Sequence, residues 1–197
     1  MTTLHLVRHA AHALVDGTLC GRMGGVHLGP EGRAQAERLS ERFAATRIEA
    51  LHTSPLDRAR QTAEPIAARL GLPAEVCDGL AEIDFGEWTG RRFDELRDDP
   101  RWRAWNAVRS LSRAPGGESM VEAQARILGH IERVRAAHPD GAVVLVSHAD
   151  MIRAALAHCL GLSLDLMLRL EIAPASVSTV EIGSWGARVI RTNEAVA

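Results

Sequence analysis

The stretch "LHLVRHAAHA", residues 4–13, decides how the chain is interpreted. Residues 3–8 are mostly apolar or β-branched, which predicts a buried β-strand. Arg8 and His9 then stand side by side where this strand must end. A guanidinium and an imidazole at a strand end are candidates for a functional site.

A second stretch, "AVVLVSHAD" at residues 142–150, has the same arrangement. Its uninterrupted apolar run is typical of a strand covered on both faces, and Ser147 and His148 follow it. Ligands gather at the carboxyl ends of the strands in parallel sheets, so we expect His9 and His148 to meet there.

Along the rest of the chain, segments with the pattern of a strand alternate with segments whose apolar residues recur at helical spacing. This alternation predicts an α/β fold with a mostly parallel sheet covered on both faces. A closing hairpin is expected around "SWG", residues 184–186. The predicted helices are residues 29–46, 54–71, 119–141 and 151–161, and a further strand is predicted at residues 48–54.

Local signals mark the ends of two of these helices. Ser54 as N-cap and Pro55 in the first turn predict one start, and Gly71 predicts its end. The start of the long helix at 119–141 resembles a capping box, formed by Ser119 and Glu122. The residues predicted to form the buried face of this helix are Val121, Ala125, Leu128, and Ile131 or Glu132.

Residues 74–118 interrupt the alternation with three tryptophans set among charges. We interpret them as an excursion over one end of the sheet, with a helical stretch near 93–106. The tryptophans, Trp88, Trp102 and Trp105, fit either the core of a lid or a wall for substrate. Residues 1–197 are therefore predicted to form a single domain with a lid-like excursion at about 85–118.

Composition excludes several classes of protein. Hydrophobic residues make up 46% of the chain, and the formal net charge is −2, so nothing favours nucleic acid or a membrane surface as partner. All 23 basic residues are arginine. Without lysine, neither lysine-bound pyridoxal chemistry nor the usual phosphate-loop lysine is available.

The three cysteines, Cys20, Cys77 and Cys159, are widely spaced and form no C-x-x-C pair. They suggest neither a disulfide framework nor a zinc ribbon, which favours a reducing compartment. No apolar run is long enough for a transmembrane helix, and the N-terminus lacks the features of a signal peptide. The expected location is the cytoplasm.

A third basic group, Arg58, is expected in the first turn of the helix at 54–71. There the helix N-terminus and the guanidinium can both face an anion. Four motifs now stand in order along the chain: "LVRHA" at residues 6–10, "SPLDRARQTA" at 54–63, "EIDFGEWTG" at 82–90 and "LVSHADMIR" at 145–153.

This pattern resembles the histidine phosphatase superfamily, also called the phosphoglycerate-mutase-like family. The resemblance implies a three-layer α/β/α sandwich and a phosphohistidine intermediate on His9. Arg8 and Arg58 would clamp the phosphoryl oxygens with planar donor forks, and His148 would donate to the same oxygens. The resemblance implies no metal and no cofactor.

The departing alkoxide needs a proton, and Glu82 is the general acid that the resemblance implies. Its carboxyl group holds a proton near neutral pH only if burial or negative neighbours raise its pKa. Asp84 and Glu87 are alternatives in the same segment.

The chain departs from the family pattern near the phosphate. Ala10 and Ala149 stand where the family usually has glycine, and the asparagine of the first loop has no clear counterpart. Gly21 or Arg22 is expected to supply that phosphate contact, and the backbone of Ala149 is expected to contribute another.

The other histidines carry weaker signals. A metal site at His9 would need His5 or His12 beside it, and the aliphatic surroundings disfavour this. The rest are interpreted as surface or satisfied core groups: His27, His52, His130, His138 and His158.

The sequence thus favours a metal-independent phosphomonoesterase acting on a small phosphorylated metabolite. The alternatives are a phosphoglycerate-type phosphomutase and a phosphoprotein phosphatase or binder on the same fold. The substrate and the oligomeric state stay open, with a homodimer among the alternatives.

Overall fold

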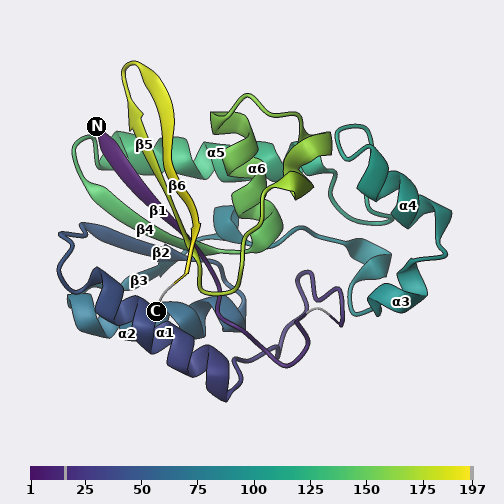
Figure 1. Cartoon of the computed structure of the whole chain (residues 1–197), viewed down its shortest axis with the longest axis horizontal. Coiled ribbons are helices and arrows are strands. Elements are labelled where there is room, and N and C mark those ends of the chain that lie inside the picture. The colour runs from purple at the N-terminus through teal and green to yellow at the C-terminus, as the bar shows by residue number, and fades with distance from the viewer. Residues whose placement is uncertain (16, 196–197) are drawn as a thin grey trace.

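In the computed structural model, which describes residues 1–15 and 17–195, strands and helices alternate along the chain (Figure 1). The strands are β1 (Thr2–Arg8), β2 (Ala50–Thr53), β3 (Ala74–Val76), β4 (Ala142–Ser147), β5 (Val177–Gly183) and β6 (Gly186–Glu194). The helices are α1 (Pro30–Phe43), α2 (Asp57–Leu70), α3 (Phe93–Leu96), α4 (Pro100–Ala107), α5 (Met120–Ala137) and α6 (Ala149–Cys159). No helix in the described part is long and apolar enough to cross a membrane.

The strands form one sheet in the order β3-β2-β4-β1-β5-β6. Strands β1 to β4 run parallel to one another, while β5 pairs antiparallel with both β1 and β6. The predicted α/β class, the mostly parallel sheet and the closing hairpin are confirmed.

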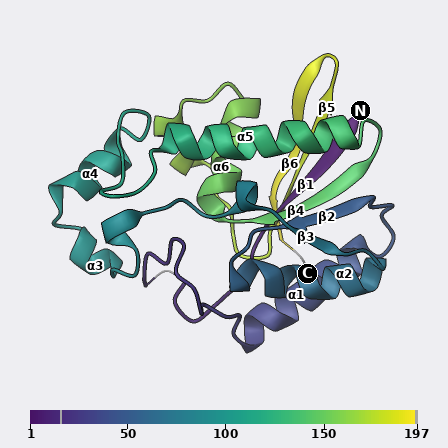
Figure 2. The ribbon, with the colours of Figure 1, turned by 180° about the vertical axis from the view of Figure 1, so that it is seen from behind.

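Helices cover both faces of this sheet (Figures 1 and 2). Strand β4 contributes side chains to the hydrophobic cores on both faces of the sheet, because successive side chains of a strand point to opposite faces. Val144 and Val146 pack with α1 and α2, whereas Val143 and Leu145 pack with α5 and α6. All four side chains are fully buried, as the apolar run at 142–150 predicts.

The predicted start of α2 is wrong. The helix begins at Asp57, three residues after Ser54, because the Ser54 N–H still donates to the Val146 carbonyl at 2.9 Å and continues the link to β4. The predicted end is confirmed, since Gly71 follows the helix in the left-handed conformation with φ +65°.

The capping box of α5 is present, with the Ser119 and Glu122 side chains each bonded to the other residue's backbone N–H. The predicted buried face is confirmed at Ile131 and wrong at Val121 and Ala125, which are exposed. Two faces of α5 carry apolar residues at helical spacing, so the sequence alone does not determine which face is buried. Packing against the sheet determines it. The buried apolar residues are Met120, Ala123, Ile127, Ile131 and Val134.

The excursion lies beyond one end of the sheet and carries α3 and α4 (Figure 2). The single helical stretch predicted near 93–106 is two helices, because Asp99 caps a new helix that begins at Pro100. The short strand β3, at the start of the interrupted segment, was not predicted. Trp88 and Trp105 are fully buried, with Trp102 packed 5.2 Å from the Trp88 ring, so these tryptophans form the core of the excursion.

Candidate active site

The two predicted strand ends meet. Strands β1 and β4 are neighbours with Arg8 opposite Ser147, and the His9 N–H donates to the Ser147 carbonyl at 2.9 Å. The rings of His9 and His148 therefore lie 5.1 Å apart, centre to centre.

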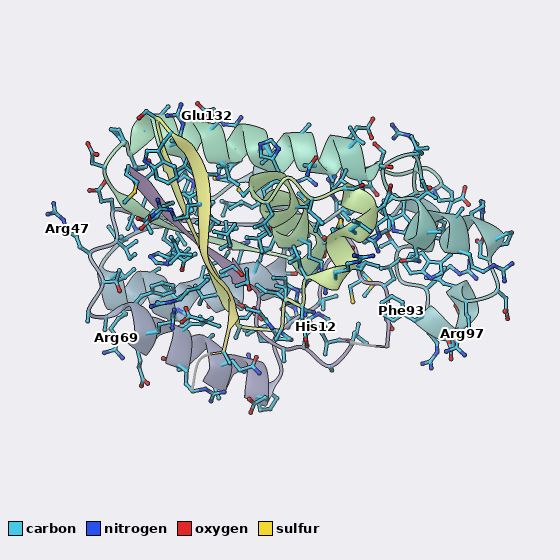
Figure 3. All side chains as sticks on the ribbon, turned by 45° about the horizontal axis from the view of Figure 1, so that its top comes forward. His12, Arg47, Arg69, Phe93, Arg97 and Glu132 are labelled. Carbon is cyan, nitrogen blue, oxygen red and sulfur yellow. The ribbon has the colours of Figure 1, made fainter. Side chains whose placement is uncertain are left out.

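A cavity of about 240 Å³ opens at this edge of the sheet. The residues lining it come from the end of β1, the first loop, the segment at Glu82, and the starts of α2, α3 and α6. Figure 3 labels two of them, His12 and Phe93. Other lining residues are Arg8, His9, Cys20, Gly21, Arg58, Glu82, Ala149, Asp150 and Arg153.

His9 is buried and neutral. Burial, followed by the positive charges of Arg58 and Arg8, holds the pKa of its imidazole well below the usual value. Nδ1 lies 2.8 Å from the Ala10 carbonyl oxygen, which can only accept, so Nδ1 carries the proton. The lone pair is then on Nε2.

Arg58 is only 2% exposed and lines the same cavity as His9. Its Nη2 donates to the Gly21 carbonyl at 2.7 Å, but its Nε and Nη1 have no hydrogen-bond partner among the described residues. Arg8 donates through Nη1 to the Ile172 carbonyl at 2.7 Å. Buried N–H groups without acceptors are costly, and a bound anion would satisfy them.

His148 lies behind the cavity, fully buried. Its Nε2 is 2.7 Å from the Ser54 hydroxyl, and its Nδ1 is 3.3 Å from Arg58 Nη2 and 3.9 Å from a Glu82 oxygen. Burial, and then the charge of Arg58, lowers the pKa of this imidazole well below its usual value.

Glu82 is a largely buried carboxyl group of the cavity with a raised pKa. Burial, and then the negative charge of Asp150, raises the pKa of Glu82 to about 7, against the opposing effect of Arg58. Asp150 stays ionised although burial alone would raise its pKa, because Arg109 and Arg153 outweigh that effect. A protonated carboxyl group beside an ionised one suits general acid chemistry near neutral pH.

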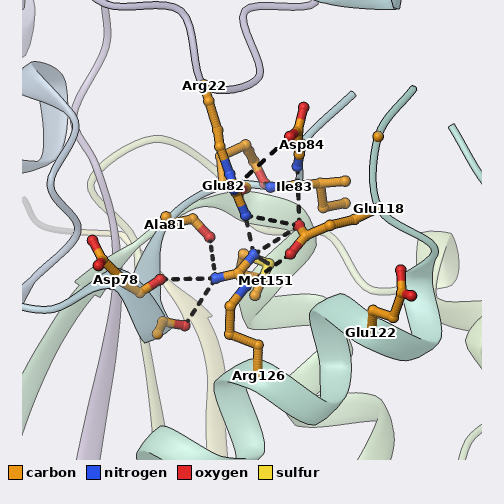
Figure 4. Close-up of polar contacts among 12 residues, drawn as sticks. Arg22, Asp78, Ala81, Glu82, Ile83, Asp84, Glu118, Glu122, Arg126 and Met151 are labelled. Carbon is orange, nitrogen blue, oxygen red and sulfur yellow. Dashed lines mark hydrogen bonds and ion pairs between the residues drawn. The ribbon is translucent and has the colours of Figure 1, made fainter. Parts of the chain in front are cut away.

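A network of arginines fixes the backbone at Glu82 (Figure 4). Arg126 donates to the Glu82 carbonyl at 3.3 Å and to Glu118 at 3.0 Å, and Arg22 donates to the same carbonyl at 2.8 Å. Three more carbonyls accept from Arg126 at 2.9–3.1 Å: those of Asp78, Gly79 and Ala81.

Comparison with known proteins identifies the family. The model of the histidine phosphatase superfamily (branch 1) matches residues 4–195. The chain belongs to the histidine phosphatase superfamily.

The relatives of this histidine phosphatase include named phosphatases. The chain is 30% identical over 187 residues to phosphoserine phosphatase 1 of Hydrogenobacter thermophilus, covering 92% of this chain and 87% of that one. The structure of mycobacterial glucosyl-3-phosphoglycerate phosphatase is similar with a TM-score of 0.87 and 26% identity, covering 98% and 99% of the two chains. That of Bacillus stearothermophilus YhfR has a TM-score of 0.92 and 27% identity, covering 98% of each chain.

Most of the predicted site residues of this histidine phosphatase come together. Arg8, His9, Arg58 and Glu82 line the cavity, and His148 contacts Arg58 from behind it.

The three remaining candidates for phosphate contacts differ in position. Gly21 and Ala149 line the cavity, whereas Arg22 does not. Instead, Arg22 pairs with Glu118 at 2.9 Å and supports the Glu82 backbone. The prediction that Arg22 contacts phosphate therefore lacks support from its position.

Sequence reasoning did not assign His12, Asp150 and Arg153 to the phosphate site of the histidine phosphatase, although all three line the cavity. His12 stacks on His9 with ring centres 5.2 Å apart, and Asp150 and Arg153 lie on the first turns of α6. The sequence could have indicated Asp150 and Arg153, because both follow His148 closely in the motif "LVSHADMIR".

Proposed function

We propose that the chain is a metal-independent phosphomonoesterase that hydrolyses a small phosphorylated metabolite through a phosphohistidine on His9. One observation carries this proposal: a neutral His9 with its lone pair on Nε2 lies in the same cavity as the unpartnered N–H groups of Arg58. This combines a nucleophile with an anion clamp.

In the proposed reaction, Arg8, Arg58 and His148 bind the phosphoryl oxygens, together with backbone groups near Gly21 and Ala149. His9 Nε2 attacks phosphorus, so that a P–N bond forms as the ester P–O bond breaks. The leaving oxygen takes its proton from Glu82. Glu82, now ionised, removes a proton from the water that cleaves the P–N bond and releases inorganic phosphate.

His148 can serve as a donor in this scheme because of Ser54. The Ser54 hydroxyl accepts the Leu56 N–H at 3.3 Å and is free to donate to His148 Nε2 at 2.7 Å. As the site stands, Nδ1 faces an Arg58 N–H at 3.3 Å and can only accept it. Once a phosphoryl oxygen takes that N–H, the Ser54 hydroxyl donates to Nε2 and the imidazole proton sits on Nδ1, 3.9 Å from a Glu82 oxygen.

Cavity size and the named relatives support a small substrate. About 240 Å³ is below the roughly 300–1,000 Å³ of typical ligand pockets. Relatives named for phosphoserine and glucosyl-3-phosphoglycerate make small phosphate esters the first candidates. We place the enzyme in the cytoplasm, as one domain with a lid.

Two alternative functions, a phosphomutase and a phosphoprotein binder, are less well supported than phosphate ester hydrolysis. A phosphoglycerate-type mutase must keep water from the intermediate, and the short excursion after the acidic segment favours hydrolysis over it. A phosphoprotein binder needs the arginines but has no use for a buried acid such as Glu82.

The test is phosphate release from a panel of phosphate esters, including phosphoserine and 3-phosphoglycerate, in the presence of a chelator. We expect metal-free release that falls to background in His9→Ala and persists in His158→Ala, whose imidazole is exposed. Undiminished release by His9→Ala would refute the mechanism, and isomerised phosphoglycerate without release would identify a mutase. Activity that vanishes with the chelator and returns with a metal ion would indicate another reaction class.

A further inference from the structure

A second cluster of reactive side chains lies outside the catalytic cavity. His52 comes from β2, Cys77 follows β3, and His130 comes from the middle of α5. None of the three lines the cavity at His9. One ligand atom of each lies within 4.8 Å of the other two.

The spacing of these atoms fits a tetrahedral metal ion. His52 Nδ1 is 3.2 Å from His130 Nε2 and 3.6 Å from Cys77 Sγ. With Zn–N near 2.0–2.1 Å and Zn–S near 2.3 Å, tetrahedral ligand atoms are separated by about 3.3–3.6 Å. Two imidazoles and a thiolate are the donor set that zinc prefers over magnesium or calcium.

The surroundings hold the ligands in this arrangement. His130 is only 4% exposed, and its Nε2 lies 3.2 Å from His52 Nδ1. A Cβ at Gly79 would lie 2.7 Å from the Cβ of His130, so the glycine makes room for this side chain.

Glu75 supplies the negative charge beside the cluster. One carboxylate oxygen is 3.7 Å from His52 Nε2 and the other is 3.7 Å from Cys77 Sγ. If Nδ1 of His52 is a metal ligand, its proton sits on Nε2 and faces this carboxylate. A carboxylate behind a ligating imidazole is the usual support in zinc sites.

We propose that His52, Cys77 and His130 bind one Zn²⁺, with Glu75 orienting His52 and water as the fourth ligand. On binding, the Cys77 thiol loses its proton to solvent and a Zn–S bond forms. The ion would join three elements, since it would fasten the three-residue edge strand β3 to β2 and α5. Its role is structural, separate from the proposed phosphate chemistry.

The experiment uses the full chain without a histidine tag, stripped of metal by a chelator. Zinc is titrated against a chromophoric competitor, and cobalt(II) is used as a spectroscopic substitute that reports thiolate ligation. We expect one ion per chain, a thiolate-to-cobalt charge-transfer band, and a zinc-induced rise in Tm of about 2 °C or more.

Matched variants locate the site. Cys77→Ser should abolish the band and weaken zinc binding more than about 10-fold, and His52→Asn should weaken it similarly. Cys159→Ser and Cys20→Ser should keep the band, the latter because Cys20 belongs to the catalytic cavity. Binding that survives Cys77→Ser, a band that is lost with Cys20→Ser, or a stripped protein that takes up no zinc would each overturn the proposal.

Discussion

Two arginines of one helix show how surroundings decide a side chain's role. Arg58 and Arg60 both lie near the start of α2, yet Arg58 is buried with unpartnered N–H groups while Arg60 is exposed. A lysine at position 58 keeps the charge but loses the planar donor fork. We expect Arg58→Lys to lower kcat/KM by roughly 100-fold or more, and Arg60→Lys to leave it unchanged. Steady-state kinetics on the best ester decide this, and equal values for both variants would contradict the clamp.

Glu82 gives the second prediction at this scale. With a pKa raised to about 7, its carboxyl group is protonated below that pH and loses its proton as the pH rises through it. Hydrolysis of alkyl phosphates, which need a proton on the leaving oxygen, should therefore fall above pH 7. Nitrophenyl phosphate, with a good leaving group, should lack this dependence.

The matching substitution is Glu82→Gln. It should lower kcat/KM for alkyl phosphates by about 10²–10⁴-fold, with a much smaller effect on kcat/KM for nitrophenyl phosphate, and remove the loss above pH 7. The comparison uses kcat/KM because hydrolysis of the phosphohistidine, in which Glu82 is the proposed base, is common to both substrates. Glu87→Gln is the control, because Glu87 is exposed and pairs with Arg101. Equal losses on both substrates would take Glu82 out of the acid role.

The residues that could be predicted are those placed by regular structure. Arg8, His9 and His148 follow apolar strands, and the register of a parallel sheet brings such positions together. Arg22 could not be placed, because it stands in an irregular loop and its partner Glu118 is distant in sequence. The cluster of His52 and His130 was missed for a similar reason, since one residue is on a strand and the other on a helix.

At the scale of elements, α5 connects the core to Glu82, the proposed general acid. Arg126 on this helix binds the carbonyl groups of the segment that leads to Glu82 (Figure 4). Arg126→Met keeps much of the apolar stem but removes these donors, so Glu82 is held less firmly. We expect kcat/KM for alkyl phosphates to fall by about 10-fold, and kcat/KM for nitrophenyl phosphate to be nearly unaffected.

Arg135→Met is the control for this helix, because Arg135 is partly exposed and pairs with the exposed Glu132 one turn before it. The substrate dependence separates positioning from folding. A merely structural role for Arg126 would lower the rates on both substrates equally, together with the Tm.

Element boundaries were predictable where a local signal decides them. The capping box at Ser119 and the glycine at Gly71 act within one turn, and both are confirmed. The start of α2 and the buried face of α5 depend on contacts with other elements, such as the bond from Ser54 to Val146. Local preference is outweighed there by packing and sheet pairing.

At the scale of the whole molecule, two apolar layers share one sheet. Ile66 on α2 and Ile127 on α5 are both fully buried, on opposite faces. Because the strands contribute side chains to both layers, loss of either layer exposes the other. The chain should therefore unfold in one cooperative transition, as the predicted single domain requires.

Matched substitutions test this cooperativity. Ile66→Val and Ile127→Val should each lower the free energy of unfolding by about 0.5–1.5 kcal/mol, and the double variant should lose the sum within about 0.5 kcal/mol. Urea unfolding is followed by circular dichroism, which reports all helices, and by tryptophan fluorescence. Trp88 and Trp105 pack with the layer of Ile127, so fluorescence reports that side of the sheet. If Ile66→Val shifted the circular dichroism transition but left the fluorescence transition in place, the two layers would be separate folding units.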